Sequence, residues 1–119
     1  MNYWKVTASA LGIVITCRGH DKEGTVGPAV RTFHDLARER GSAFTIVGDL
    51  RDMTGYETES RVAWQQAFYQ HRKQIEGLVL VGARSALIRM GAAAVGAFAG
   101  IPVRFVASWD DVAGALRAG

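Results

Sequence analysis

The most chemically suggestive stretch lies in mid-chain, where an apolar run ends in polar side chains. Asp49 and Asp52 supply two carboxylates and Thr54 supplies a hydroxyl, with Gly55 directly after them. Open α/β sheets present their functional groups at the carboxyl ends of strands, in loops that lead into the next helix. The pattern therefore predicts a strand over residues 43–50 and a functional loop from 49 to 56.

The same carboxylates allow two other interpretations. A hard cation prefers several oxygen ligands, and this region offers four carboxylates: Asp49, Asp52, Glu57 and Glu59. A receiver domain also has an aspartate after its third strand, but it needs an acidic pair after its first strand and a lysine after its last. Here those positions read Arg18-Gly19-His20-Asp21 and Ala107-Ser108-Trp109, so the receiver interpretation fails twice. We expect no metal site.

Neither the histidines nor the serines form a catalytic pattern. His20, His34 and His71 are far apart, and no two have the spacing of metal ligands on a helix. The segment Gly82-Ala83-Arg84-Ser85 lacks the glycines of a phosphate-binding loop or a nucleophile elbow. Arg84, Ser85 and the amides that follow could still bind an anion. We therefore expect a protein that is not an enzyme and needs no cofactor.

Composition narrows the class of protein. The chain has 119 residues, of which 49% are hydrophobic and 21% charged, so we expect one globular domain over 1–119. The net charge of +3 is spread without a concentrated basic run, which argues against nucleic-acid binding. The single cysteine, Cys17, excludes an intrachain disulfide. The longest uncharged apolar run, 90–103, is too short to cross a bilayer, and no signal peptide is visible, so we expect a cytoplasmic protein.

Strand and helix signals alternate along the chain. Strands are expected over 3–8, 13–17, 43–50, 78–82 and 101–106. Helices are expected from Thr25 to Gly41, from Thr58 or Ser60 to about Gly77 with Ile75 on the inner stripe, over 86–99 behind a Ser85 cap, and after Ser108. The first two strands should form a hairpin. The remaining alternation predicts a mostly parallel sheet with right-handed crossovers, wedged between helices.

The helix expected over 86–99 is apolar on almost every side after Arg89. Its small residues, which include Gly96 and Gly100, would let another surface approach closely. Two interpretations stay open. The small residues could allow tight packing on the sheet, or a second apolar face could be covered by a partner chain, a neighbouring helix or a lipid-like ligand.

In this order of elements the chain resembles the STAS domain, and more closely its SpoIIAA-like branch, sometimes grouped as STAS/SEC14-like. The resemblance covers the whole chain and rests on Gly48-Asp49-Leu50-Arg51-Asp52, on the basic stretch 71–76, on the apolar strand 78–82, on the Ala-rich helix, on Val103-Arg104-Phe105 and on Asp110-Asp111. It implies an α/β fold with a mostly parallel five-stranded sheet, an N-terminal hairpin and four helices.

The resemblance also implies a function. STAS domains of the antagonist type act by binding, and a kinase phosphorylates a serine or threonine of a D-[ST]-[ST]-G motif. Here Asp52-Met53-Thr54-Gly55 keeps the carboxylate, one hydroxyl and the glycine, while Met53 replaces a second hydroxyl residue. Thr54 is thus the candidate phospho-switch, and the alternative is that it is only a turn or cap residue.

The implied partner is a protein, for example a kinase or an anti-sigma-type regulator, and a homodimer is a further option. The expected partner-binding loop comprises Asp49, Arg51, Asp52, Thr54, Gly55 and Tyr56. The implied role is that of a non-enzymatic regulatory or scaffold domain similar to anti-sigma-factor antagonists. The SEC14-like comparison implies the alternative, a carrier or sensor of a hydrophobic small molecule or lipid.

Overall fold

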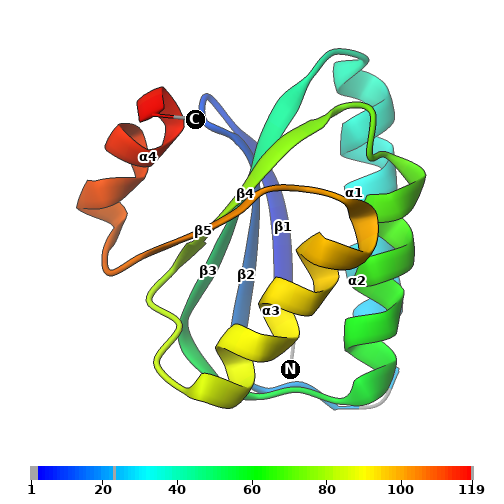
Figure 1. The fold of residues 1–119 in the computed structure, drawn as a ribbon. Coiled ribbons are helices and arrows are strands. Elements are labelled where there is room, and N and C mark those ends of the chain that lie inside the picture. The colour runs from blue at the N-terminus through cyan, green and yellow to red at the C-terminus, as the bar shows by residue number, and fades with distance from the viewer. Residues whose placement is uncertain (1–2, 23, 119) are drawn as a thin grey trace.

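A computed structural model describes residues 3–22 and 24–118, in which strands and helices alternate after an N-terminal hairpin (Figure 1). The strands are β1 (Trp4–Ser9), β2 (Gly12–His20), β3 (Phe44–Gly55), β4 (Ile75–Val81) and β5 (Val103–Val106). The helices are α1 (Val26–Arg40), α2 (Thr58–Gln70), α3 (Ala86–Ala99) and α4 (Val112–Ala118), the last preceded by a 3-10 turn, η1 (Trp109–Asp111).

The five strands lie in the order β1-β2-β3-β4-β5, with β1 and β2 antiparallel and the other pairs parallel. The predicted fold class is confirmed. Right-handed crossovers that always add the next strand on the same side place their helices on one face. Accordingly α1, α2 and α3 cover one face of the sheet, and α4 lies against the other (Figure 1). The sheet therefore lies between helices, as predicted, with α1, α2 and α3 sharing one of its faces.

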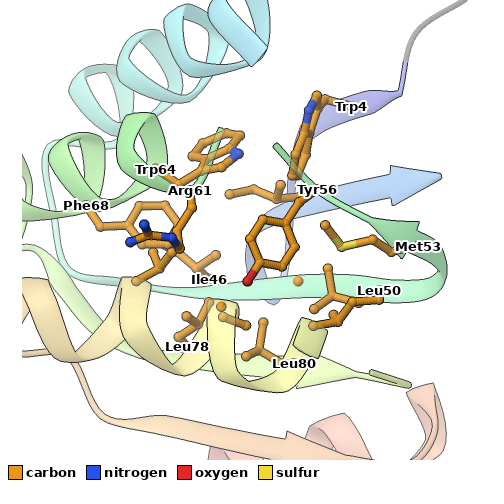
Figure 2. Close-up of a pocket in the computed structure, with 16 residues that line it drawn as sticks. Trp4, Ile46, Leu50, Met53, Tyr56, Arg61, Trp64, Phe68, Leu78 and Leu80 are labelled. Carbon is orange, nitrogen blue, oxygen red and sulfur yellow. The ribbon is translucent and has the colours of Figure 1, made fainter. Parts of the chain in front are cut away.

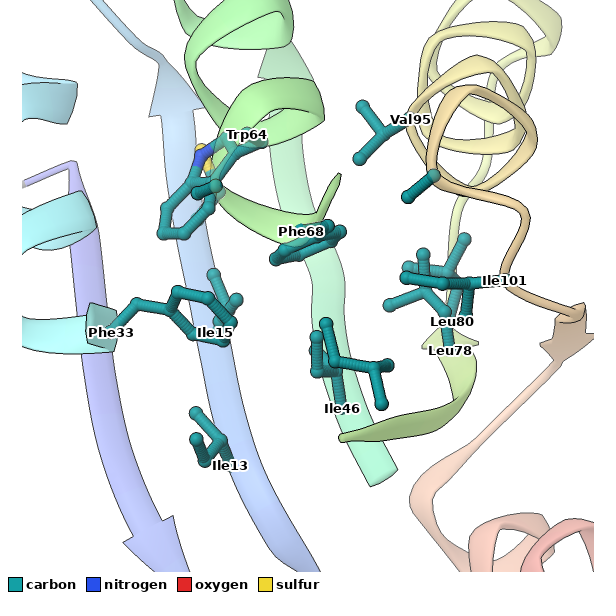
Figure 3. Packing of buried hydrophobic residues seen from close by; sticks show 14 of the residues in the cluster. Ile13, Ile15, Phe33, Ile46, Trp64, Phe68, Leu78, Leu80, Val95 and Ile101 are labelled. Atoms are coloured by element: carbon teal, nitrogen blue, oxygen red, sulfur yellow. The ribbon is translucent and has the colours of Figure 1, made fainter. Parts of the chain in front are cut away.

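The main core fills the space between the sheet and the three helices (Figure 3). Phe33 of α1 is fully buried, and its ring centroid lies 5.3 Å from that of Phe68 and 6.0 Å from that of Trp64. On the other face a smaller cluster of buried side chains joins Val47, Val79 and Val81 to Val112 of α4. Strand β4 is thus buried on both faces, as its continuous apolar run predicted.

Strand β3 is longer than predicted and runs through the expected loop to Gly55. It keeps pairing because β2 also extends further than expected, to His20. Thr16 pairs with Asp49 but Arg18 with Asp52, and Gly19 pairs with Met53 but His20 with Gly55. Each shift inserts one extra residue on β3, a β-bulge that bends the strand. Residues 49–55 are therefore a bulged strand end and not a loop.

The other correction concerns the second helix. Helix α2 ends at Gln70, and Ile75 begins β4, where it pairs with Phe44. Ile75 is buried as expected, but a strand places it there. Two predicted boundaries are confirmed: Gly41 ends α1 with a left-handed φ of 64°, and the Ser85 hydroxyl accepts the Ile88 N–H at 3.1 Å and caps α3.

Candidate functional site

Asp49 is buried on the α4 face of the sheet, where its carboxylate binds the guanidinium group of Arg51. Its two carboxylate oxygens accept Nε and Nη2 of Arg51, each at 2.9 Å, and Oδ2 also accepts Nε1 of Trp109 at 3.1 Å. Burial alone would raise the pKa of Asp49, but the hydrogen bonds from Arg51 and Trp109, with the Arg51 charge, outweigh it and leave the pKa below 3.8. Asp49 therefore positions Arg51, and its carboxylate is not free to contact a partner.

Arg51 crosses the end of β4 because Gly82 leaves room for it. Gly82 has a φ of 70°, and a Cβ there would lie 2.4 Å from Cγ of Arg51. Glycine is thus required both by the left-handed backbone and by the passage of the Arg51 side chain. With Nε and Nη2 bonded to Asp49, the Nη1 donors of Arg51 point away from that carboxylate.

Three arginines surround a hollow of about 430 Å³ beside Gly82. Arg51 comes from β3, Arg84 from the β4–α3 connection and Arg89 from α3, and Phe105, Val106 and Ala107 complete the lining with Ala83. Arg89 is fixed by a 3.0 Å hydrogen bond from its Nε to the carbonyl of Ala83. No carboxylate lines this hollow among the described residues. We call it the three-arginine hollow.

The structure separates the two residues predicted to bind an anion. Arg84 is exposed and lines the three-arginine hollow. Ser85 caps α3, and its carbonyl accepts the Arg89 N–H at 3.1 Å. Ser85 does not line the hollow, and the charged side chains that do are arginines. Anion binding here stays a prediction.

The predicted switch residue lies on the bulged end of β3. Thr54 and Asp52 are exposed, whereas Gly55 is buried, and a Cβ on Gly55 would meet the His20 ring at 2.5 Å. Thr54 is the extra residue of the second bulge, between the pairs formed by Met53 and Gly55. It therefore precedes α2 by several residues and is not in its first turn.

Tyr56 joins the end of β3 to the first turn of α3. Its hydroxyl donates to the Leu87 carbonyl at 3.3 Å, and its ring packs on Gly91, where a Cβ would come within 2.5 Å. Leu87 and Met90 are 62% and 70% exposed on the outer side of α3. We define the rim surface as Asp52, Thr54, Tyr56, Leu87 and Met90. The close approach at Gly91, and that of Gly96 to Val103, favours tight packing as a role of the small residues in α3.

A second buried carboxylate, Asp21, was missed in the sequence. Asp21 is fully buried; its Oδ1 accepts the Glu57 N–H at 3.0 Å, and its Oδ2 accepts the Ser60 hydroxyl. Asp21, which directly follows β2, thereby caps α2. The N-cap residue itself, Glu57, makes no capping hydrogen bond with its side chain. The only sequence signal was an acidic residue in a glycine-bounded polar stretch, which reads as an ordinary loop.

An apolar cavity of about 80 Å³ lies between the sheet and the helices α2 and α3 (Figure 2). Its lining includes Leu50, Met53 and Leu80, with Tyr56 and Arg61 as polar members. Trp4 and Trp64 also line it, and their buried Nε1 atoms have no hydrogen-bond partner among the described residues. The cavity combines apolar walls with a cationic side chain, a lining suited to an amphiphilic ligand.

Two histidines that are distant in sequence meet between α1 and the end of α2. His34 Nδ1 lies 2.8 Å from His71 Nε2, and His71 Nδ1 lies 3.2 Å from Gln74 Oε1. Burial lowers the pKa of His34, and the nearby His71 and Arg38 lower it further. His71 is buried, and its pairing with His34 was not anticipated from the sequence.

Within residues 3–22 and 24–118, no group of three or more histidine, cysteine or acidic side chains is placed to hold a metal. The carboxylates considered for a cation are dispersed: Asp49 binds Arg51, and Glu57 lies 3.3 Å from His20. No described helix combines the length and apolar character needed to span a bilayer.

Comparison with known proteins identifies the fold. No family model and no curated protein matches the sequence. An uncharacterized protein of the DUF3478 family with a SpoIIAA-like fold, from Shewanella loihica PV-4, superposes with a TM-score of 0.72 at 10% identity, over 95% of this chain and 91% of that one. An anti-sigma factor antagonist from Mycobacterium paratuberculosis gives 0.60 at 17% identity, over 96% and 92%. The chain has a SpoIIAA-like fold, as the resemblance implied.

Proposed function

We propose that this chain is a regulatory domain that acts by binding a protein partner through the rim surface. The observation that carries the proposal is the link made by Tyr56, which joins the exposed end of β3 to the exposed apolar side chains Leu87 and Met90. Large exposed apolar groups beside polar ones are typical of interaction sites. The fold shared with an anti-sigma factor antagonist supports the same class of function.

Within this surface Thr54 is the proposed switch, and a kinase in the cytoplasm would act on it. Transfer of the γ-phosphoryl group of ATP would replace the Oγ–H bond by an Oγ–P bond and release ADP and a proton. The phosphate adds a charge of about −1.5 to −2 at pH 7. It would stand beside Asp52, so the rim would repel acidic partners and attract basic ones. Because Thr54 lies in β3, this effect relies on charge and not on the dipole of α2.

Site-specific crosslinking tests the binding surface. A photoreactive amino acid at Leu87 should capture a partner in cells of the native host, whereas the same group at Thr32, exposed on the remote helix α1, should not. Replacing Met90 with aspartate should abolish the crosslink at Leu87. Equal capture from both positions, or capture unaffected by Met90→Asp, would refute a specific rim contact.

Intact-mass measurement tests the switch. After incubation with host lysate and ATP, the wild type should gain one phosphoryl group that Thr54→Ala lacks. Thr58→Ala, which removes a neighbouring exposed hydroxyl at the start of α2, should retain it. A phosphoform that survives Thr54→Ala would exclude Thr54 as the switch.

The apolar cavity favours a second candidate, a carrier or sensor of a hydrophobic small molecule. An engineered cavity of about 150 Å³ holds benzene, so about 80 Å³ cannot enclose an acyl chain unless α2 and α3 separate. An acceptor atom on the ligand could bond the unpartnered indole of Trp4 or Trp64. Native mass spectrometry should detect a bound molecule that Gly91→Leu excludes; an apo mass for protein from its native host would eliminate this candidate.

A further inference from the structure

The convergence of Arg51, Arg84 and Arg89 is electrostatically unfavourable unless something offsets it. Like charges at short range raise the energy of the folded state. Asp49 uses both carboxylate oxygens on Arg51 and Trp109, and Asp52, whose charge also acts on Arg51, is exposed and does not line the hollow. From residue 77 to residue 109 the sequence contains no aspartate or glutamate. The hollow therefore carries excess positive charge that its own segment does not neutralise.

Two of the three guanidinium groups are held in place, and their outer donors remain available. Asp49 fixes Arg51 through Nε and Nη2, and the Ala83 carbonyl fixes Arg89 through Nε. The structure gives Nη1 of Arg51 and both Nη atoms of Arg89 no protein partner among the described residues. A planar guanidinium with its stem fixed loses little freedom on binding and matches the geometry of a phosphate.

The hollow also has the position and shape of a small-molecule site. It lies where β4 and β5 end, next to Arg51 of β3, at the carboxyl edge of the parallel strands where α/β sheets bind ligands. Its volume of about 430 Å³ is within the range typical of such sites. Phe105, 40% exposed, gives the hollow an apolar wall, whereas the Val106 side chain packs on the cluster beside α4.

We propose that the three-arginine hollow binds the phosphate monoester of a small organic molecule. Asp49 offsets the charge of Arg51, so Arg84 and Arg89 supply the two positive charges that a phosphate monoester dianion would meet. Phe105 would contact the organic part of that molecule. This site lies apart from the proposed rim contact and does not depend on it.

Titration with phenyl phosphate, followed by calorimetry and by the indole N–H resonances in NMR, tests the proposal. The probe should bind saturably and more tightly than inorganic phosphate, because of the apolar wall. The Trp109 N–H signal should shift, since Trp109 shares Asp49 with Arg51. Arg84→Gln and Arg89→Gln should each weaken binding about tenfold to a hundredfold, the range for a lost charged hydrogen bond.

Arg31→Gln is the matched control, because Arg31 is exposed on α1 far from the hollow and its loss changes the net charge equally. It should leave the affinity unchanged. An equal loss in Arg31→Gln, or no saturable binding of phenyl phosphate, would overturn the proposal. If the protein does not bind phenyl phosphate but sediments with vesicles of phosphatidic acid, the proposal is overturned in favour of binding to a membrane surface.

Discussion

Buried polar side chains in this protein are positioned by partners that come from other parts of the chain. Asp49 of β3 receives a donor from Trp109, and Asp21 receives donors from the start of α2. Neither pairing follows from local sequence, since the partners are separated by 60 and 36 residues. By contrast, the pairing of Asp49 with Arg51 is local, and both residues belonged to the predicted site.

Asp49→Asn should lower the free energy of unfolding by about 1–3 kcal/mol at pH 7, the range for hydrogen bonds to a charged group. The pKa of Asp49 is lowered by folding, so its ionised form stabilises the protein above about pH 3.9 and that stabilisation is lost as the pH falls through the folded-state pKa. Urea unfolding should therefore separate wild type and variant at pH 7 and bring them together in acid. Asp35→Asn, an exposed control, should change stability by less than about 0.5 kcal/mol.

Cys17 should be unreactive in the native protein. It is fully buried, and burial, with the charge of Asp21, raises the pKa of its thiol to about 12, so little thiolate exists at pH 8. Iodoacetamide should label the chain only in denaturant, which mass spectrometry can follow. Rapid labelling under native conditions would show that the β1–β2 hairpin opens readily.

At the scale of elements, the sequence predicts a helix start together with its capping residue when that residue is adjacent to the helix. When the capping residue comes from elsewhere in the chain, the sequence does not identify it. Ser85 caps α3 from the adjacent position, so sequence alone identified it. Helix α2 is capped by Asp21 from another element, and only its approximate start was predictable. Likewise β3 could not be extended to Gly55 from its own residues, because its pairing there depends on the length of β2.

Asp21→Ala should destabilise the protein by about 2 kcal/mol or more, because it removes a helix cap and leaves the Glu57 N–H and the Ser60 hydroxyl without their acceptor. Ser60→Ala keeps the cap to Glu57 and should cost less. Thermal and chemical unfolding measure both. If Asp21→Ala leaves the free energy of unfolding unchanged, another group must cap α2.

At the scale of the whole molecule, the histidine pair couples α1 to the end of α2 through a contact at 2.8 Å. In that geometry one ring must donate and the other accept, so the two rings cannot both be charged without breaking the bond. Protonation of both rings therefore opposes the packing of these two helices.

Stability should fall as the pH is lowered from 6.5. Folding lowers the pKa of His34 below 6.5, so the unfolded chain takes up the proton first as the pH falls. The contribution of neutral His34 to the free energy of unfolding is therefore complete above pH 6.5 and is lost between pH 6.5 and the folded-state pKa. Chemical unfolding at several pH values should show this slope. His34→Gln, whose amide can still donate to His71, should flatten it; an unchanged slope would assign the effect elsewhere.

The sequence by itself determined the alternation of strands and helices, the hairpin, the buried β4, the Gly41 end of α1 and the Ser85 cap of α3, because these depend on neighbouring residues and on periodicity. The tertiary structure alone decided which side chains meet: Asp49 with Trp109, Asp21 with Ser60, His34 with His71, and three arginines around one hollow. Such contacts depend on strand register, bulges and crossover direction. These features result from many small effects along the whole chain, so the residues at each contact carry no local sequence signal of it.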